Sequence, residues 1–376
     1  MGIRIAVVGG GIGGLTTARA LNTVGLPCVV LERAGVPRET GYGIQLGPDG
    51  ARLLPNLGVH LDGTAVRPVT RELRRWSDNT LLSRETLPAP YFTLPRSELH
   101  RLLSADVPVR HGTPCAGVTE TPDGVTLELA DGGTLTADLV IGADGLHSVV
   151  RAAVGADEVR CSGSSAFRAV VRRDAPPRVV VWLGPGQHCV AYPIAPGLLN
   201  VVATVGVPGG PRPLPADPLP AYHDWHPDVR QLLAAGRTPS AHGLFDRPPL
   251  ARWHTRRIVL VGDAAHPMLP YRAQGASLAI EDATTLAACL ASGPLEDATD
   301  LARALARYDA LRRPRVAAVA DAVRAAARDH DLPDGPDQQN RDRRLAEEPA
   351  AVPINPAPPP EAAPPPGAAP RVGADR

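Results

Sequence analysis

The chain has 376 residues, of which 44% are hydrophobic and 21% are charged, and its 39 basic residues are balanced by 39 acidic ones. This length allows a sizeable core and two or three lobes. The balanced charge excludes the basic surface that binds nucleic acid or an anionic membrane. Five cysteines without C-x-x-C spacing exclude a zinc site and a disulfide framework. No apolar run reaches the length of a membrane span. We therefore expect a cytoplasmic monomer or homodimer that binds no metal and no nucleic acid.

The first segment, "IRIAVVGGGIGGLTTARALNTVG", predicts a buried strand over residues 3–8 and then a helix. Gly9, Gly11 and Gly14 stand between them in G-x-G-x-x-G spacing, which lets the backbone turn tightly and approach a pyrophosphate. Glu32 ends the next apolar run, near the spacing of about 20 residues expected of an acid that binds a ribose hydroxyl. The alternative is that the glycines only form a turn. The residues expected to contact a dinucleotide, FAD or NAD, are Gly9, Gly11, Ile12, Gly13, Gly14, Glu32 and Arg33.

Two later segments repeat this strand, loop and helix design: "ADLVIGADGLHSVVRAAVG" in the middle of the chain and "RRIVLVGDAAHPMLPYRAQGASLAIEDATTLAACLA" after residue 255. Their continuous apolar strands are typical of a buried parallel sheet. Residues 65–95 and 160–207 instead alternate in polarity between turn signals, which predicts an antiparallel sheet. The sequence therefore predicts an α/β protein in which a β-rich lobe interrupts a nucleotide-binding lobe.

The C-terminal part has two textures. Residues 301–328 are alanine-rich with a helical pattern, and Pro314 is expected to mark a break in that helix. Residues 345–376 are rich in proline and alanine and have almost no large apolar side chains. Such a segment cannot bury enough surface to fold, so a disordered tail is expected.

Taken together, "GGGIGG", "IGADGLHSVVR" and "LVGDAAHPMLPYRAQGASLAIEDA" resemble the class A FAD-dependent aromatic monooxygenases, such as salicylate hydroxylase, 3-hydroxybenzoate 6-hydroxylase and 6-hydroxynicotinate 3-monooxygenase. The resemblance runs from residue 3 to about residue 320. It implies the fold of para-hydroxybenzoate hydroxylase, in which a discontinuous Rossmann-type FAD-binding domain is interleaved with an antiparallel β-sheet substrate domain. The ranges expected are 1–66, 96–158 and 250–330 for the FAD-binding domain and 67–95 and 159–249 for the substrate domain.

The second and third motifs add candidate cofactor contacts. Asp263, at the carboxyl end of its strand, can accept a hydrogen bond from a ribityl hydroxyl. The helix that begins near Gly275 directs its positive end toward the flavin ring edge that becomes anionic on reduction. Asp144 and Arg96 match family positions that touch the cofactor, although Asp144 can also be a helix cap and Arg96 a surface charge. The residues that the resemblance assigns to FAD here are Arg96, Asp144, Gly145, Gly262, Asp263, Pro270, Gly275 and Ala276.

His188 and Tyr192 lie four residues apart in "GPGQHCVAYP", so both lie on one face of the predicted strand. The resemblance implies that they line the substrate pocket and that the histidine is a catalytic base; the ordinary alternative is a structural histidine. Arg272 stands where relatives carry an apolar residue. It either selects an anionic substrate or covers apolar surface with its stem. The expected substrate contacts are His188, Tyr192, Pro270 and Arg272.

The resemblance implies an NAD(P)H-consuming monooxygenase that hydroxylates a small, phenolic aromatic or heteroaromatic compound with O₂ through a C4a-hydroperoxyflavin. An FAD-dependent epoxidase or dehydrogenase that tailors a natural product is the main alternative, because one fold hosts several reactions. A non-catalytic flavin-binding protein is a further alternative.

Overall fold

The computed structural model describes residues 2–36, 42–206, 217–236 and 240–347. A five-stranded parallel sheet organises the first lobe, in the order β17-β11-β1-β2-β7. Its strands are β1 (Ile5–Val8), β2 (Cys28–Leu31), β7 (Val109–Arg110), β11 (Leu139–Gly142) and β17 (Ile258–Leu260). β1, β11 and β17 are buried along their whole length, as continuous apolar strands of a covered sheet must be.

Helices and a small second sheet complete the core of this lobe. Helix α1 (Ile12–Thr23) packs against α6 (Gly275–Ala291), and both begin at the carboxyl ends of parallel strands. A three-stranded antiparallel sheet adds the side chains of Val125 and Leu127 to the same core. It consists of β8 (Cys115–Thr121), β9 (Gly124–Leu129) and β10 (Thr134–Ala137), and β8 contacts the short helix α4 (Val150–Val154).

A seven-stranded sheet forms the second lobe, in the order β16-β12-β15-β14-β13-β4-β5. Its strands are β4 (Thr70–Arg75), β5 (Leu81–Thr86), β12 (Arg160–Arg172), β13 (Arg178–Gly184), β14 (Gln187–Ala195), β15 (Leu198–Gly206) and β16 (Ser240–Asp246). The sheet is antiparallel except where β4 pairs in parallel with β13. A purely antiparallel sheet was expected. The parallel pair arises because β4 and β5 arrive as a separate hairpin from a distant part of the chain.

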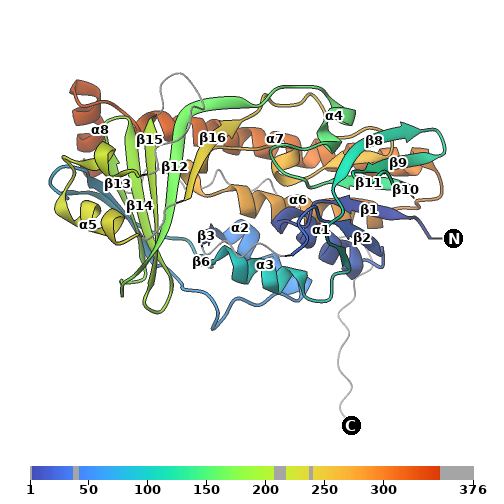
Figure 1. Cartoon of the computed structure of the whole chain (residues 1–376), viewed down its shortest axis with the longest axis horizontal. Coiled ribbons are helices and arrows are strands. Elements are labelled where there is room, and N and C mark those ends of the chain that lie inside the picture. Colours follow the sequence, from blue (N-terminus) through green and yellow to red (C-terminus); the bar gives the residue numbers. More distant parts are fainter. Residues whose placement is uncertain (1, 37–41, 207–216, 237–239, 348–376) are drawn as a thin grey trace, which may run out of the picture.

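Some of the short elements lie between the two large sheets (Figure 1). A two-stranded antiparallel ladder joins β3 (Gly43–Leu46) to β6 (Phe92–Pro95), and α3 (Arg96–Ser104) follows it directly. The remaining short elements are α2 (Pro48–Ala51), η1 (Leu54–Leu57), η2 (Leu219–Tyr222), α5 (Pro227–Ala235), η3 (Gly262–Ala264) and η4 (Pro270–Arg272).

Helix α7 (Ala298–His330) runs along the molecule from the first lobe to the second (Figure 1). The expected break at Pro314 is wrong, because α7 continues through it. A proline removes one backbone donor from a helix, but ion pairs of the neighbouring Arg312 and Arg315 to other elements hold this turn in place.

Helix α8 (Pro336–Glu347) was not anticipated. It packs against β5, and Leu345 is buried in the core of the second lobe. The expected tail therefore begins at least three residues too early, and its remainder, 348–376, lies outside the described residues. Among the helices that are described, none combines the length and apolar character needed to cross a membrane. Within the same residues, no group of histidine, cysteine and acidic side chains has an arrangement that could hold a metal ion.

Candidate active site

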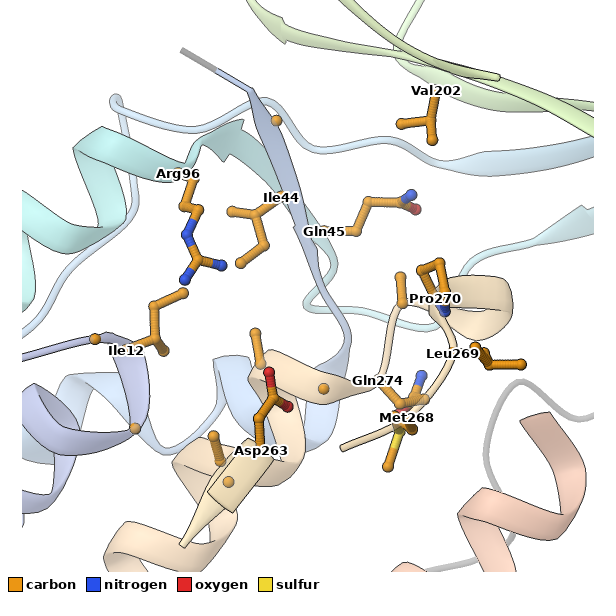
Figure 2. Close-up of a pocket in the computed structure, with 18 of the residues that line it drawn as sticks. Ile12, Ile44, Gln45, Arg96, Val202, Asp263, Met268, Leu269, Pro270 and Gln274 are labelled. Atoms are coloured by element: carbon orange, nitrogen blue, oxygen red, sulfur yellow. The ribbon is translucent and has the colours of Figure 1, made fainter. Parts of the chain in front are cut away.

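A groove runs along the carboxyl ends of the parallel strands, where the three glycine-containing loops meet. The first loop contributes Gly11, Ile12 and Gly13, and the second contributes Ala143 and Gly145. The third contributes residues 261–263 and most of 268–276. In Figure 2, Gln45 lies between Val202 of the seven-stranded sheet and Pro270 of this third loop. Open α/β sheets bind their ligands at this edge.

The glycines of the first loop are of two kinds. A Cβ at Gly14 would lie 1.9 Å from the carbonyl oxygen of Gly9, so this residue allows helix and loop to approach closely. Gly9 itself has a φ of +107°, which favours glycine. A Cβ at Gly11, in contrast, would meet no protein atom within 4 Å, although the residue lines the groove. The space beside Gly11 thus belongs to the groove, where a pyrophosphate can approach the backbone at the start of α1.

Two charged side chains face each other across the groove. Arg96, at the start of α3, and Asp263, just after β17, point into it from opposite walls (Figure 2). Both side chains are solvent-exposed through the open groove. Desolvation by the surrounding walls lowers the pKa of Arg96 and raises that of Asp263, and the attraction between the two charges opposes both shifts. Arg96 is thus a charge of the groove rather than of the outer surface.

The third loop is fastened to α6 and α7 by the buried carboxylate of Asp282. That carboxylate accepts hydrogen bonds from the backbone N–H of Gly262 at 2.9 Å and from Arg312 Nε at 2.7 Å, and it contacts His266 Nε2 at 2.5 Å. Burial by itself raises the pKa of Asp282, but the charges of His266 and Arg312 outweigh burial and bring that pKa to about 2. Sequence reasoning missed Asp282, although it lies within the third motif.

Arg151 fastens the same loop from the other side. Its guanidinium, 1% exposed, donates to the carbonyl oxygens of Ala264 and Ala265 at 2.9 and 2.7 Å, and it pairs with Asp157. Arg151 ends the second motif, "IGADGLHSVVR", so the signal that could have identified it was present. The backbone of the loop is therefore held by hydrogen bonds to two buried charged side chains, Asp282 and Arg151.

Five expected cofactor residues lie outside the lining of the groove: Gly9, Gly14, Glu32, Arg33 and Asp144. The Glu32 carboxylate accepts from the backbone N–H groups of Gly10 and Ala34 at 2.7 and 2.8 Å, and Arg33 is exposed. Asp144 accepts from Ser148 Oγ and from two backbone N–H groups at the start of α4. This is the helix-capping role that stood as the alternative for Asp144.

His188 and Tyr192 lie buried on one face of β14, and both line the groove where it meets the seven-stranded sheet. A second cavity opens beside this point, between the sheet and helices α7 and α8. Residues that line both spaces are Gln45, His188, Val190, Pro270 and Ala273. His188 therefore stands at the junction of the groove and the second cavity.

The surroundings of His188 were not foreseen. Its Nδ1 lies 3.0 Å from Asp331 Oδ1 and 3.1 Å from Thr204 Oγ1. The Tyr271 hydroxyl donates to the other carboxylate oxygen of Asp331, and the rings of Tyr271 and His330 pack against the imidazole. Asp331 and His330 come from the end of α7, more than 140 residues along the chain, so no local pattern could have linked them to His188.

The second cavity is lined by charge. Arg71 pairs with Glu85 at 3.1 Å, and Arg344 pairs with Asp329 at 2.7 Å. Arg272 lies in the same wall, where burial lowers the pKa of its guanidinium, as does the charge of Arg71, while Glu85 opposes the shift. Three arginines against two acids leave this lining with one formal positive charge.

Comparison with known proteins agrees with this geometry. The FAD binding domain family matches residues 3–199 and 246–323. The chain is 42% identical over 368 residues to a 3-amino-4-hydroxybenzoate 2-monooxygenase of Streptomyces cremeus, a match that covers 91% of each chain. It is 35% identical to a 3-hydroxybenzoate 6-hydroxylase of Klebsiella oxytoca, with 87% of this chain and 88% of that one covered. Among solved structures, Klebsiella pneumoniae HpxO complexed with FAD and uric acid superimposes with a TM-score of 0.83 at 27% identity, over 92% and 93% of the two chains.

The fold and the groove define a class A flavoprotein hydroxylase, an FAD-dependent monooxygenase that consumes NAD(P)H and O₂ and acts on a small aromatic substrate. The chain belongs to the FAD binding domain family. Its relatives favour hydroxylation over the epoxidase, dehydrogenase and non-catalytic alternatives.

Proposed function

We propose that the substrate is a hydroxybenzoate, an aromatic ring that carries a phenolic hydroxyl and a carboxylate, with 3-amino-4-hydroxybenzoate as the first candidate. The observation that carries this proposal is the position of His188 between the groove and the positively charged second cavity. Three related monooxygenases of Streptomyces, 41 to 42% identical to this chain, are named for that aminohydroxybenzoate.

The phenolic end of the substrate lies at His188 in this proposal. FAD, once reduced by NAD(P)H and exposed to O₂, supplies an electrophilic oxygen, so the ring must be made electron-rich. His188 takes the phenolic proton as a general base, and Tyr192, on the same face of β14, positions the ring. The apolar wall of Val190 and Pro270 excludes water from the reacting carbon.

The carboxylate end lies in the second cavity, toward Arg272 and Arg71. A carboxylate there can accept charge-assisted hydrogen bonds from these arginines, which an uncharged phenol cannot match. Arg272 thus selects for an anionic substrate.

The groove lining supports a matching set of proposed cofactor contacts. Gly11 and the start of α1 would hold the pyrophosphate, Asp263 would bind a ribityl hydroxyl, and Pro270 and the N-terminus of α6 would hold the flavin ring. We place the enzyme in the cytoplasm, where the five cysteines, unpaired in this structure, stay reduced.

The test is a substrate panel assayed with the purified flavoprotein. NAD(P)H oxidation, hydroxylated product and hydrogen peroxide are measured together for 3-amino-4-hydroxybenzoate, 3-hydroxybenzoate and the matching benzamides. We expect coupled hydroxylation of at least one hydroxybenzoate and loss of coupling with its amide. Efficient hydroxylation of the amides contradicts the proposal. A failure to hydroxylate any of the acids contradicts it as well.

A further inference from the structure

We infer that Asp331, held by the hydroxyl of Tyr271, is the residue that orients His188 for proton transfer. The inference rests on the proposed role of His188 as the base. It assigns a function to the C-terminal end of α7, beyond residue 323, where the match to the FAD binding domain family ends.

The carboxylate fixes which nitrogen of the imidazole carries hydrogen. An ionised carboxylate only accepts hydrogen bonds, so the 3.0 Å contact requires a hydrogen on His188 Nδ1. In a neutral imidazole the lone pair is then on Nε2. Within the described residues no hydrogen bond to Nε2 is recorded, and the residue lines both the groove and the second cavity. His188 is therefore set in the tautomer that a general base needs.

Asp331 can perform this task because its own position is fixed twice. Its backbone closes the last turn of α7, where its N–H donates to the carbonyl of Ala327. Its second carboxylate oxygen accepts from the Tyr271 hydroxyl. Burial raises the pKa of Tyr271, and the Asp331 charge raises it further, so the phenol stays protonated and remains a donor.

Helix α7 also connects Asp331 to the cofactor loop. Arg312, in the middle of α7, donates to Asp282, and Asp282 in turn holds Gly262. Tyr271 belongs to η4 at the end of the same loop. The contacts that shape the flavin loop and those that orient His188 are therefore parts of one framework.

The proton transfer balances without a further reactant. The phenolic O–H bond breaks and an N–H bond forms at Nε2, which leaves an imidazolium between a phenolate and the Asp331 carboxylate. The carboxylate stabilises that positive charge. The proton stays on Nε2, and Asp331 remains the acceptor of the Nδ1 hydrogen throughout the step.

The first variant is Asp331→Asn, which removes the charge with little change in shape. Asp321→Asn is the matched control, because Asp321 lies on the same helix in an exposed pair with Arg324. Assays use 3-amino-4-hydroxybenzoate, or the hydroxybenzoate that the panel shows to be hydroxylated. We expect parental FAD content and parental flavin reduction by NAD(P)H. The product formed per NAD(P)H consumed should fall by about tenfold or more, up to the roughly 10²- to 10⁴-fold that a general base supplies.

The pH profile of kcat/KM separates orientation from simple packing. Without the carboxylate the imidazolium is less stable, so the acidic limb of the profile moves to lower pH in Asp331→Asn. The titratable or charged groups that face His188 or its cavity are Tyr271, His330, Asp331, Tyr222, Arg71, Glu85, Arg272, Asp329 and Arg344. Burial, followed by the charge of His188, lowers the pKa of His330. Burial raises the pKa of Tyr222. Neither His330 nor Tyr222 therefore supplies the acidic limb of the profile.

Two further variants make every outcome decisive. Tyr271→Phe keeps the ring that packs on His188 and removes only the hydroxyl. It should therefore lower the product per NAD(P)H by less than Asp331→Asn does. If Asp331→Asn does not fold, Tyr271→Phe is the variant that tests the inference. His188→Ala should uncouple as strongly, and adding Asp331→Asn to it should cost nothing more. The inference is overturned if Asp331→Asn keeps the parental coupling and the parental pH profile of kcat/KM. If Asp331→Asn does not fold, the same result in Tyr271→Phe overturns it. Parental coupling in His188→Ala instead overturns the proposed base.

Discussion

The cofactor groove and the second cavity are neighbours that share five lining residues, yet they are built in opposite ways. Much of the groove wall is backbone, supplied by three loops that each follow a parallel strand. The wall of the second cavity is formed mainly by side chains from β3, β4, β5, β13, β14, η4, α7 and α8. The groove depends on backbone shape, whereas the cavity depends on which side chains the fold brings together.

This difference has a functional consequence. A groove that binds a constant cofactor needs conserved geometry, which buried ionic contacts such as those of Asp282 and Arg151 provide. A cavity that selects a substrate can change one side chain, such as Arg272, without disturbing the groove. We therefore expect substitutions in the groove framework to change stability and FAD binding, and substitutions in the cavity to change substrate selection alone.

The largest effect is expected for Asp282→Asn, which breaks the groove framework. Removing one partner of a buried ion pair costs about 3–5 kcal/mol of unfolding free energy, and FAD should be lost in parallel. The pKa of Asp282 is lowered to about 2, so the contribution of its charge is present above its unfolded pKa of about 3.9 and is lost as pH falls from about 4 toward about 2. The gap between parent and variant in urea unfolding should narrow in that window. A urea-unfolding midpoint at pH 7 equal to that of the parent contradicts this role. Glu98→Gln is the control, because Glu98 pairs with Arg101 at the surface.

A smaller effect, confined to the cavity, is expected for Arg272→Leu. Loss of a charge-assisted hydrogen bond costs about 1.5–3 kcal/mol, or roughly 10- to 150-fold in KM for the acid substrate. FAD titration should be unchanged, and KM for the matching benzamide should change little. If the melting temperature falls while KM for the acid stays constant, Arg272 covers apolar surface and does not select the substrate.

The smallest effect is expected for Gly11→Ala, which tests whether the groove wall must be bare backbone. Gly11 has a φ of −79° that alanine adopts readily, and the new Cβ meets no protein atom. The apoprotein should therefore change in stability by less than about 1 kcal/mol, while FAD affinity falls by about 1–3 kcal/mol because the methyl group overlaps the pyrophosphate. Gly14→Ala is the informative counterpart, since its Cβ collides with Gly9 and should destabilise the protein itself. Equal FAD affinity in Gly11→Ala and the parent places the pyrophosphate elsewhere.

Features set by local sequence could be predicted, whereas features that depend on tertiary contacts could not. The strands and helices around the glycine motif were predictable, because apolar periodicity and G-x-G-x-x-G spacing are local. Pro314 was misjudged because the local cost of a proline is offset by contacts of Arg312 and Arg315 that only the fold creates. Helix α8 was missed because its polar sequence has little apolar pattern, and Leu345 alone enters a core.

The sequence by itself determined the parallel sheet, the loops of the cofactor groove and the shared face of His188 and Tyr192, because strand and helix periods act over a few residues. Only the tertiary structure decided that Asp331, at the far end of α7, meets His188 and that Arg71 and Arg272 share one cavity. Side chains more than a hundred residues apart in the chain become neighbours through the packing of whole elements. No local pattern records that packing, so the residues proposed to orient His188 could be found only in the folded protein.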